Sequence, residues 1–417
     1  MLELTDDERA AASGARGEGA GMAMRIVAEA ARLMGALRLI KVASAHIDGA
    51  LYHGDSGTLF AEKLVEGGAR VAVPATLNVG ALDLTGCARV RLEGRTREMA
   101  KRLMRAYEAM GCAASWTCAP YQAGHRPAQG SDVAWGESNA VAFCNSVLGA
   151  RTNRYGDFLD IACAISGRAP DYGLHRPENR RAVFVFDARA LQPELRNSDT
   201  IFPVLGALFG RIAGTDVGVV EGLQGCCNDD RLKAFGAAAA SSGGVGLFHV
   251  AGVTPEAPDA TTALGSRAAE RTVVVTPAML ADGLAALSTA SGDQIDAVAI
   301  GSPHLSLAEV DELARLLGQR AAQKTIYACT GRHVMKIIDA DGRRRALEKQ
   351  GVAFVVDTCV VVTPILPEKG GVLMTNSGKF AHYAPGNTGY AVQYGSLSDC
   401  VESAVEGRLV RTDPIWT

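Results

Sequence analysis

The residues most suited to chemistry lie between Ser115 and Asp160, a polar stretch within a largely apolar chain. Cys118 stands there in a proline-containing loop, and Glu137, Ser138 and Asn139 open a helical run after a glycine. A thiolate is a metal ligand, and the free amides of a helix N-terminus bind carboxylates. The plain alternative for the helical junction is a cap formed by its serine. The stretch therefore predicts either a site for an acidic ligand or an ordinary loop–helix junction.

Ten cysteines are scattered along the chain without a Cys-x-x-Cys pair. Most are expected to be reduced thiols in a cytoplasmic protein, and several sit in apolar runs as small hydrophobic residues. Cys118 and Cys359 differ, because both stand in loops with polar neighbours. Three thiolates from separate loops would hold an iron–sulfur cluster with one iron open as a Lewis acid; the alternative is a set of buried thiols.

Further polar candidates lie in the predicted loops. Tyr52 and Asp55 are suited either to binding an amine or hydroxyl group or to stabilising a turn. Arg151 is suited either to gripping a carboxylate with two hydrogen bonds or to pairing at the surface. Asn78 is either a ligand-binding amide or a turn residue. The sequence alone leaves both interpretations open for each of these residues.

Composition limits the class of protein and its partners. The chain has 417 residues, of which 48% are hydrophobic and 21% charged, with a formal net charge of -3. These values describe a globular protein of two or three domains and argue against nucleic acid or a membrane surface as the main partner. The first residues predict a helix with a capping box of Thr5 and Glu8, and there is no run of about 18 apolar residues. We therefore expect a cytoplasmic protein.

Helical periodicity alternates with short apolar runs along the whole chain. Helices are predicted at 19–35, 59–66, 95–110 and 396–406, and strands at 37–42, 70–73, 182–186, 217–220, 245–250, 273–275, 297–300, 325–328 and 353–356. This alternation predicts an α/β fold with mostly parallel sheets and ligands beyond the strand ends. We expect a first domain at 1–165 and further α/β domains at 166–417. The segment 369–386 is predicted to be a loop that closes over the ligand with Lys379.

Several segments together resemble the large subunit of the aconitase X family. They read AHID, YHGDSG, VPATLNV, MGCAASWTCAPYQ, AWGESNAVAFCNSVLGARTNRYGDF, GLFHVAGVTPEAP, GSPHLSL, VVDTC and TNSGKFAHYAPG. The resemblance covers essentially the whole chain. It implies aconitase-like α/β layers, an iron–sulfur cluster and a hydro-lyase reaction. It also implies a small swivelling domain, expected here as a separate subunit that contributes a serine as the catalytic base.

The resemblance also implies which residues form the site. The cluster cysteines match Cys118 and Cys359, whereas the third position carries Ser302 where archaeal members have cysteine. The third ligand is then either the Ser302 alkoxide, which is weaker than a thiolate, or a thiolate of Cys226, Cys227 or Cys329, and the cluster is either [2Fe-2S] or [4Fe-4S]. The catalytic and substrate-binding positions match Gly49, Ala50, Leu51, Tyr52, Asn78, Glu137, Ser138 and Lys379, and we add Asp55, Asn139 and Arg151 as neighbouring polar candidates.

Within the family, the GSPH and YHGDSG forms are similar to the bacterial branch that dehydrates cis-3-hydroxy-L-proline to Δ1-pyrroline-2-carboxylate. Acidic loop residues such as Asp48 or Asp55 suit the ring ammonium of this substrate, and Lys379 or the helix start at Glu137 suits its carboxylate. Phosphomevalonate dehydratase is the first alternative, but acidic loops repel a phosphate. The second is a non-catalytic metabolite-binding or scaffold subunit that has lost its cluster with Ser302.

Overall fold

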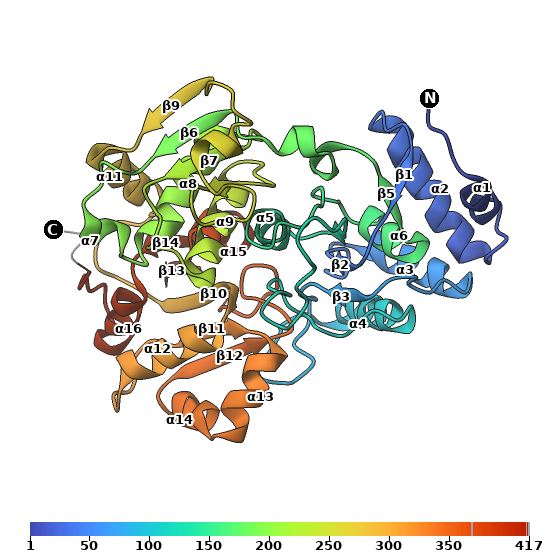
Figure 1. Ribbon diagram of the computed structural model, residues 1–417. Helices are drawn as coiled ribbons and strands as arrows, with labels where there is room; N and C mark the ends of the chain where they lie inside the picture. Colours follow the sequence, from blue (N-terminus) through green and yellow to red (C-terminus); the bar gives the residue numbers. More distant parts are fainter. Residues whose placement is uncertain (368–369, 414, 416–417) are drawn as a thin grey trace. The chain divides into compact units, whose positions relative to one another are not determined.

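The computed structural model describes residues 1–367, 370–413 and 415, and the chain forms two compact units (Figure 1). Unit 1 comprises Met1–Leu82 and Leu92–Arg181. Unit 2 comprises Asp83–Arg91 and the chain from Ala182 onward. The chain therefore enters unit 2 at Asp83, returns to unit 1 at Leu92 and enters unit 2 again at Ala182. The domain boundary placed at residue 165 stays a prediction.

Unit 1 contains a small parallel sheet in the order β3-β2-β4. Its strands are β2 (Ala45–Ile47), β3 (Ala75–Leu77) and β4 (Ala134–Trp135), and a separate antiparallel pair joins β1 (Leu39–Lys41) to β5 (Arg168–Pro170). The helices are α1 (Asp6–Ala12), α2 (Glu18–Leu33), α3 (Asp55–Glu66), α4 (Gly94–Ala109), α5 (Ser138–Ser146) and α6 (Leu159–Ser166). Two short 3₁₀ turns follow, at Gly173–His175 and Pro177–Arg180.

One predicted strand of unit 1 is wrong and four were missed. The segment 70–73 is not a strand, because the amides of Val71 and Ala72 bond to carbonyls at the ends of α4 and α6 instead of to a neighbouring strand. Strands β2, β3, β4 and β5 all lie outside the ranges predicted as strands. Each is only two or three residues long, so it leaves almost no alternation in the sequence.

Unit 2 contains two larger parallel sheets. The first has the order β8-β7-β6-β9, formed by β6 (Phe184–Asp187), β7 (Gly218–Glu221), β8 (His249–Val250) and β9 (Arg271–Val274). Its connections carry α7 (Pro193–Arg196), α8 (Ile201–Ala213), α9 (Asp229–Ser242) and α10 (Ala260–Ala263), and α11 (Pro277–Ala286) follows. The predicted mostly parallel α/β architecture is thus confirmed.

Close packing of α8 on α9 depends on two glycines. A Cβ atom at Gly206 would lie 2.2 Å from the carbonyl oxygen of Phe235, and one at Gly210 would lie 2.4 Å from that of Ala239. Glycine therefore lets the two helix backbones touch along a run of small residues on α9. This contact sets the position of α9, which carries the buried residue Lys233.

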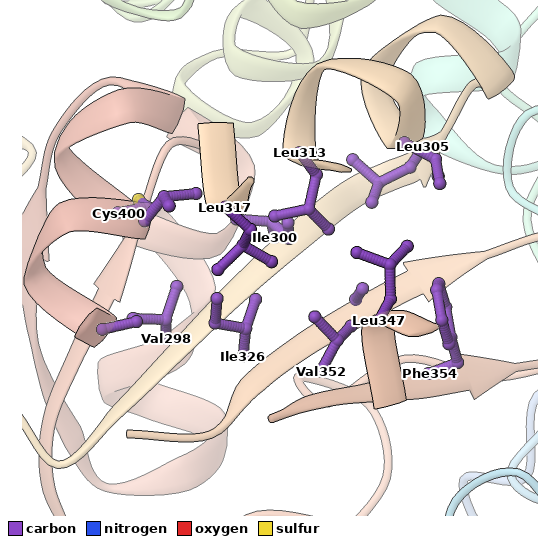
Figure 2. Close-up of a cluster of buried hydrophobic side chains, with 14 of the residues drawn as sticks. Val298, Ile300, Leu305, Leu313, Leu317, Ile326, Leu347, Val352, Phe354 and Cys400 are labelled. Carbon is purple, nitrogen blue, oxygen red and sulfur yellow. The ribbon is translucent and has the colours of Figure 1, made fainter. Parts of the chain in front are cut away.

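The second sheet of unit 2 has the order β12-β11-β10-β13-β14. Its strands are β10 (Ala297–Leu305), β11 (Ile326–Thr330), β12 (Val352–Val356), β13 (Gly371–Thr375) and β14 (Tyr390–Tyr394). Its helices are α12 (Leu307–Leu317), α13 (Arg332–Ala340), α14 (Arg343–Lys349), α15 (Gly378–Thr388) and α16 (Leu397–Glu406). Figure 2 shows Val298 and Ile300 of β10 packed beneath Leu313 and Leu317 of α12, with Cys400 of α16 beside them.

Two predictions about unit 2 need correction. The segment 369–386 is not a single loop, because its described part forms β13 and the start of α15; residue 369 lies outside the described residues. The strand predicted at 297–300 is longer than expected, since β10 runs through the GSPH segment to Leu305 with a register shift against β11. The predicted capping box of Thr5 with Glu8 is present, and a second capping box joins Ser306 to Glu309. Among the described residues, no helix is long and apolar enough to cross a membrane.

Candidate active site

Polar side chains gather in unit 1 where the three parallel strands end. Because β2 pairs in register with both β3 and β4, the residues just beyond the strands, Asp48, Asn78 and Glu137, meet at one edge of the sheet. The side-chain amide of Asn78 donates to the Asp48 carboxylate at 2.5 Å. The other amide atom of Asn78, Oδ1, is buried and has no hydrogen-bond partner among the described residues. A buried acceptor of this kind is available to a ligand.

The α5 helix begins at this edge with an unusual backbone. Glu137 precedes the helix with φ of 32°, a left-handed conformation that costs energy in a residue other than glycine. Its carboxylate accepts hydrogen bonds from the Ala140 amide (2.7 Å) and the Ser138 hydroxyl (3.2 Å), and all three groups are buried. Glu137, rather than the serine considered from the sequence, is therefore the cap. Its carboxylate occupies the amide position that an acidic ligand would use at this helix start.

Cys118 lies beside the same edge. Ser115 binds both the amide and the carbonyl of Leu77 at 2.8 Å, and the Thr117 amide donates to Leu77 at 3.1 Å. Asn139 of α5 donates to the Cys118 carbonyl at 3.1 Å. The predicted cysteine loop and helix start are therefore held together within unit 1.

A neutral layer lies beneath this edge. Nδ1 of His46 is 2.8 Å from the Thr76 hydroxyl, which is 2.7 Å from Nδ1 of His125, and both rings contact Trp135. Burial lowers the pKa of His46 well below its usual value and lowers that of His125 to about 4. Both imidazoles are uncharged at neutral pH, so neither supplies a positive charge to the carboxylates above.

The other unit 1 candidates are less central. Gly49, Ala50, Leu51 and Tyr52 follow β2, but the Tyr52 hydroxyl donates to Asp55 at 2.7 Å. Asp55 starts α3 and also pairs with Arg95 at 2.6 Å, so its charge is already balanced at the surface. Arg151 forms a backbone bridge next to β4, and its Nε is buried without a hydrogen-bond partner among the described residues.

In unit 2, Ser302 and Cys359 belong to neighbouring strand-end segments. Nε2 of His304 donates to the carbonyl of Thr358 at 3.2 Å, which joins the GSPH segment to the loop that carries Cys359. Ser377 donates to the Ser302 carbonyl and caps α15, whose first turn contains Lys379. Three of the predicted residues, Ser302, Cys359 and Lys379, are thus connected within unit 2.

The Cys359 loop is fixed by a buried aspartate. Asp357 adopts φ of 64° and pairs with Arg332 through two hydrogen bonds of 2.6 and 2.8 Å. The Leu84 amide also donates to this carboxylate, at 3.2 Å. Burial raises the pKa of Asp357, although the guanidinium opposes the shift. The paired, left-handed aspartate sets the direction in which the chain leaves β12 toward Cys359.

The three cysteines considered as alternative third ligands lie in different surroundings. Cys329 is fully buried in β11, where its carbonyl packs against Gly301, the neighbour of Ser302. Cys226 and Cys227 precede α9 and are partly exposed. Burial raises the pKa of Cys227 to about 12, which disfavours the thiolate that a metal needs. Among the described residues, no group of three or more His, Cys, Asp or Glu side chains is arranged to hold a metal ion.

Two charged residues near these segments were missed in the sequence. Asp160 of α6 is fully buried behind the turn at Asp48. Lys233 of α9 is 2% exposed and bonds to Asp230 (2.8 Å) and Glu309, and it lines a cavity of about 40 Å³ that also touches Ser302. Asp160 left a signal, because it is the one charge in an otherwise apolar helical run, and a charged residue is almost never buried without a partner or a function. Lys233 left none, because it follows three other charged residues at the start of α9.

The strand-end geometry in both units is typical of α/β proteins that bind a small ligand beyond the carboxyl ends of parallel strands. Comparison with known families defines the class further. Residues 1–178 match the first domain of aconitase X, 182–285 the second domain and 295–406 the third. The chain therefore belongs to the aconitase X family, which confirms the resemblance found in the sequence.

Individual relatives support the same family assignment. The chain is 42% identical to a cis-3-hydroxy-L-proline dehydratase of Pseudomonas aeruginosa over 98% of this chain and 71% of the relative. It is 38% identical to the phosphomevalonate dehydratase large subunit of Methanothermobacter thermautotrophicus, over 91% of this chain and 92% of the relative. A crystal structure of Thermococcus kodakaraensis aconitase X (holo-form) matches with a TM-score of 0.86 at 32% identity, covering 97% of this chain and 100% of the other.

Proposed function

We propose that this protein is a hydro-lyase subunit that dehydrates cis-3-hydroxy-L-proline to Δ1-pyrroline-2-carboxylate. The similarity to relatives of that name, at 42% and 39% identity, is greater than that to phosphomevalonate dehydratase large subunits at 38% and below. The observation in the structure that carries the proposal is the set of two carboxylates and an amide, Asp48, Glu137 and Asn78, at one sheet edge. This edge attracts an ammonium group and repels a phosphate.

In the proposed reaction a base removes the Cα proton, the electron pair forms the C2–C3 double bond, and the 3-hydroxyl leaves with a proton as water. The resulting enamine tautomerises to the cyclic imine. Asp48 binds the ring ammonium, which keeps the substrate oriented while the proton is removed. Lys379 provides the positive charge for the substrate carboxylate, because the Glu137 side chain already occupies the helix start. The base is proposed to be a serine of the small subunit.

Cys118 and Cys359 are proposed as thiolate ligands of an iron–sulfur cluster, of the [2Fe-2S] or [4Fe-4S] type, that acts as a Lewis acid toward the leaving hydroxyl. Both side chains fit this role because each is 7–8% exposed at a strand-end segment with polar neighbours, unlike the fully buried Cys329. Ser302 occupies the third position with an oxygen in place of sulfur. We further propose a small-subunit partner, as the name "large subunit" of the archaeal relatives suggests.

The experiment is anaerobic co-purification with the candidate small subunit, followed by iron analysis and assays with cis-3-hydroxy-L-proline and with phosphomevalonate. Cys118→Ala and Cys359→Ala are each expected to abolish cluster absorbance and dehydration. Cys87→Ala serves as the matched control, because Cys87 is a partly exposed thiol that is not a predicted cluster ligand. This variant should retain both the cluster absorbance and the dehydration activity. Turnover of phosphomevalonate without turnover of cis-3-hydroxy-L-proline would change the proposed substrate to phosphomevalonate. An active Cys118→Ala/Cys359→Ala variant with its full iron content would overturn the assignment of the two cysteines as cluster ligands.

A further inference from the structure

Asp160 is a buried carboxylate that binds the turn following β2. It is the second residue of α6, and its side chain is fully shielded from solvent. Oδ2 accepts the backbone amides of Asp48 (2.6 Å) and Gly49 (3.1 Å), and Oδ1 accepts the amide of Ile161 (2.6 Å). A single side chain thus ties α6 to the Asp48–Gly49 turn at the candidate active site.

Close packing leaves this turn little freedom. A Cβ atom at Gly49 would lie 2.8 Å from the Tyr107 hydroxyl, and one at Gly136 would lie 2.6 Å from Cβ of Asp48 and 3.2 Å from Oδ2 of Asp160. The two glycines therefore let the loops after β2 and β4 close around one carboxylate. A shift of the carboxylate would be felt by both loops, because no space remains between them.

The surroundings of Asp160 contain anionic and neutral groups. The titratable groups that act on it or are acted on by it are Asp48, Asp157, Tyr107, Cys112 and Cys163. Burial raises the pKa of Asp160 to about 7, and the neighbouring carboxylates add to the shift while the backbone amides oppose it. A buried carboxylate facing other carboxylates costs stability when ionised, so a function offers a reason for its presence.

We infer that Asp160 is a positioning residue of the active site, whose carboxylate holds the Asp48–Gly49 turn so that Asp48 faces the ammonium group of the substrate. The inference rests on the proposed function. An ionised carboxylate is a stronger acceptor for two backbone amides than a neutral group of the same shape. A bound ammonium ion also favours the ionised form of both aspartates, so substrate binding and Asp160 ionisation support each other.

Asp160→Asn tests the inference because asparagine keeps the shape, loses the charge and replaces one of the two acceptor oxygens by an amide donor. In the complex with the small subunit, we expect KM for cis-3-hydroxy-L-proline to rise about tenfold at pH 8, the ratio between charged and neutral acceptors. We expect kcat to change by less than about threefold, since the reacting atoms are untouched. Wild-type KM should rise as the pH falls through about 7, and the variant should lack this limb.

Asp157→Asn is the matched control, being the same change at an exposed neighbour. It removes one of the negative charges that raise the pKa of Asp160. The KM limb should therefore remain and move to slightly lower pH. A loss of the limb in Asp157→Asn, or an unchanged limb in Asp160→Asn, would overturn the assignment of the titration to Asp160.

Two further measurements do not depend on the substrate assignment. Hydrogen exchange of the amides at Asp48 and Gly49 should be faster in Asp160→Asn than in wild type, and unchanged exchange would refute the positioning role even if the wild type proves inactive on cis-3-hydroxy-L-proline. The Tm should also respond: the pKa of Asp160 is higher when folded than unfolded, so stability falls as pH rises from about 4 to 7 in the wild type, and less so in the variant. If Asp160 had a purely structural role, Asp160→Asn would lower the stability and leave the KM for cis-3-hydroxy-L-proline unchanged.

If Asp160→Asn fails to fold, Gly49→Ala displaces the same turn and leaves the carboxylate in place. Its new methyl group would meet the Tyr107 hydroxyl at 2.8 Å, and Tyr107→Phe removes that atom. We expect KM to rise in Gly49→Ala and to recover in Gly49→Ala/Tyr107→Phe. An unchanged KM in Gly49→Ala would show that the position of the turn does not matter and would overturn the inference.

Discussion

Replacing Lys233 with methionine removes a buried positive charge from unit 2 while keeping a side chain of similar length. The ammonium group is 2.8 Å from the Asp230 carboxylate, bonds to Glu309 and lies 3.4 Å from the carbonyl of His304 in the GSPH segment. Lys233 therefore joins α9 to the N-terminus of α12 and to the strand that carries Ser302. Its loss leaves two carboxylates facing each other without a cation.

The size of the effect follows from the burial of the three groups. Breaking a buried ion pair by removing one partner costs about 3–5 kcal/mol. The side chains of Asp230 and Glu309 are 27% and 25% exposed, whereas that of Lys233 is 2% exposed, so water relieves part of the cost on the carboxylate side. We therefore expect the lower end, about 3 kcal/mol, which corresponds to a fall in Tm of roughly 6 °C for a unit of this size.

Calorimetry of Lys233→Met, Glu309→Gln and the double variant measures the coupling directly. The double variant should be less destabilised than the sum of the single variants by about 2 kcal/mol, because the second change removes a charge that the first left unpaired. Additive effects, or a loss below about 1 kcal/mol for Lys233→Met, would refute the view that this network supports the GSPH segment. With the cluster loaded, Lys233→Met should also alter the cluster spectrum if that segment contacts iron.

Two further substitutions test close packing. Gly136→Ala places a methyl group 2.6 Å from Cβ of Asp48. We therefore expect at least a tenfold loss of kcat/KM in a steady-state assay. Near-normal activity would show that the sheet edge at Asp48 is not tightly packed. Gly206→Ala places a methyl group 2.2 Å from the Phe235 carbonyl on α9. We expect the free energy of unfolding, measured by chemical denaturation, to fall by about 1–3 kcal/mol. A stability equal to wild type would contradict the close contact of α8 with α9.

Local patterns in the sequence correctly predicted many of the longer elements. Helices α2, α4 and α16 and the strands β6 to β12 of unit 2 lie where the periodicity predicted them, whereas β13 and β14 were not predicted. The cap at Thr5 follows a local rule between residues three positions apart. The strands of unit 1 that position the candidate site are two or three residues long and escaped notice. So short a strand is stabilised by its neighbours in the sheet, and those neighbours are distant in sequence.

The candidate site residues divide in the same way. Motifs were sufficient to single out Cys118, Glu137 and Asn78, because their resemblance to the family is carried by consecutive residues. The roles of the neighbouring acids were not predictable: Asp55 resembles Asp48 in the sequence, but only the structure shows that Asp55 is neutralised by Arg95. Such assignments depend on through-space charge, which falls with distance in space and not with separation along the chain.

The sequence by itself determined the family and the α/β class with mostly parallel sheets, and it singled out the candidates that we propose as ligands of a cluster and of a small acid. Those properties depend on local pattern and on motifs of consecutive residues. Only the tertiary structure decided that the Asp48 turn is held by Asp160, that Glu137 caps its own helix, and that Lys233 lies buried beside the GSPH segment. Each of these is a contact between groups whose burial, partners and pKa arise from folding, so no single segment of the chain contains them.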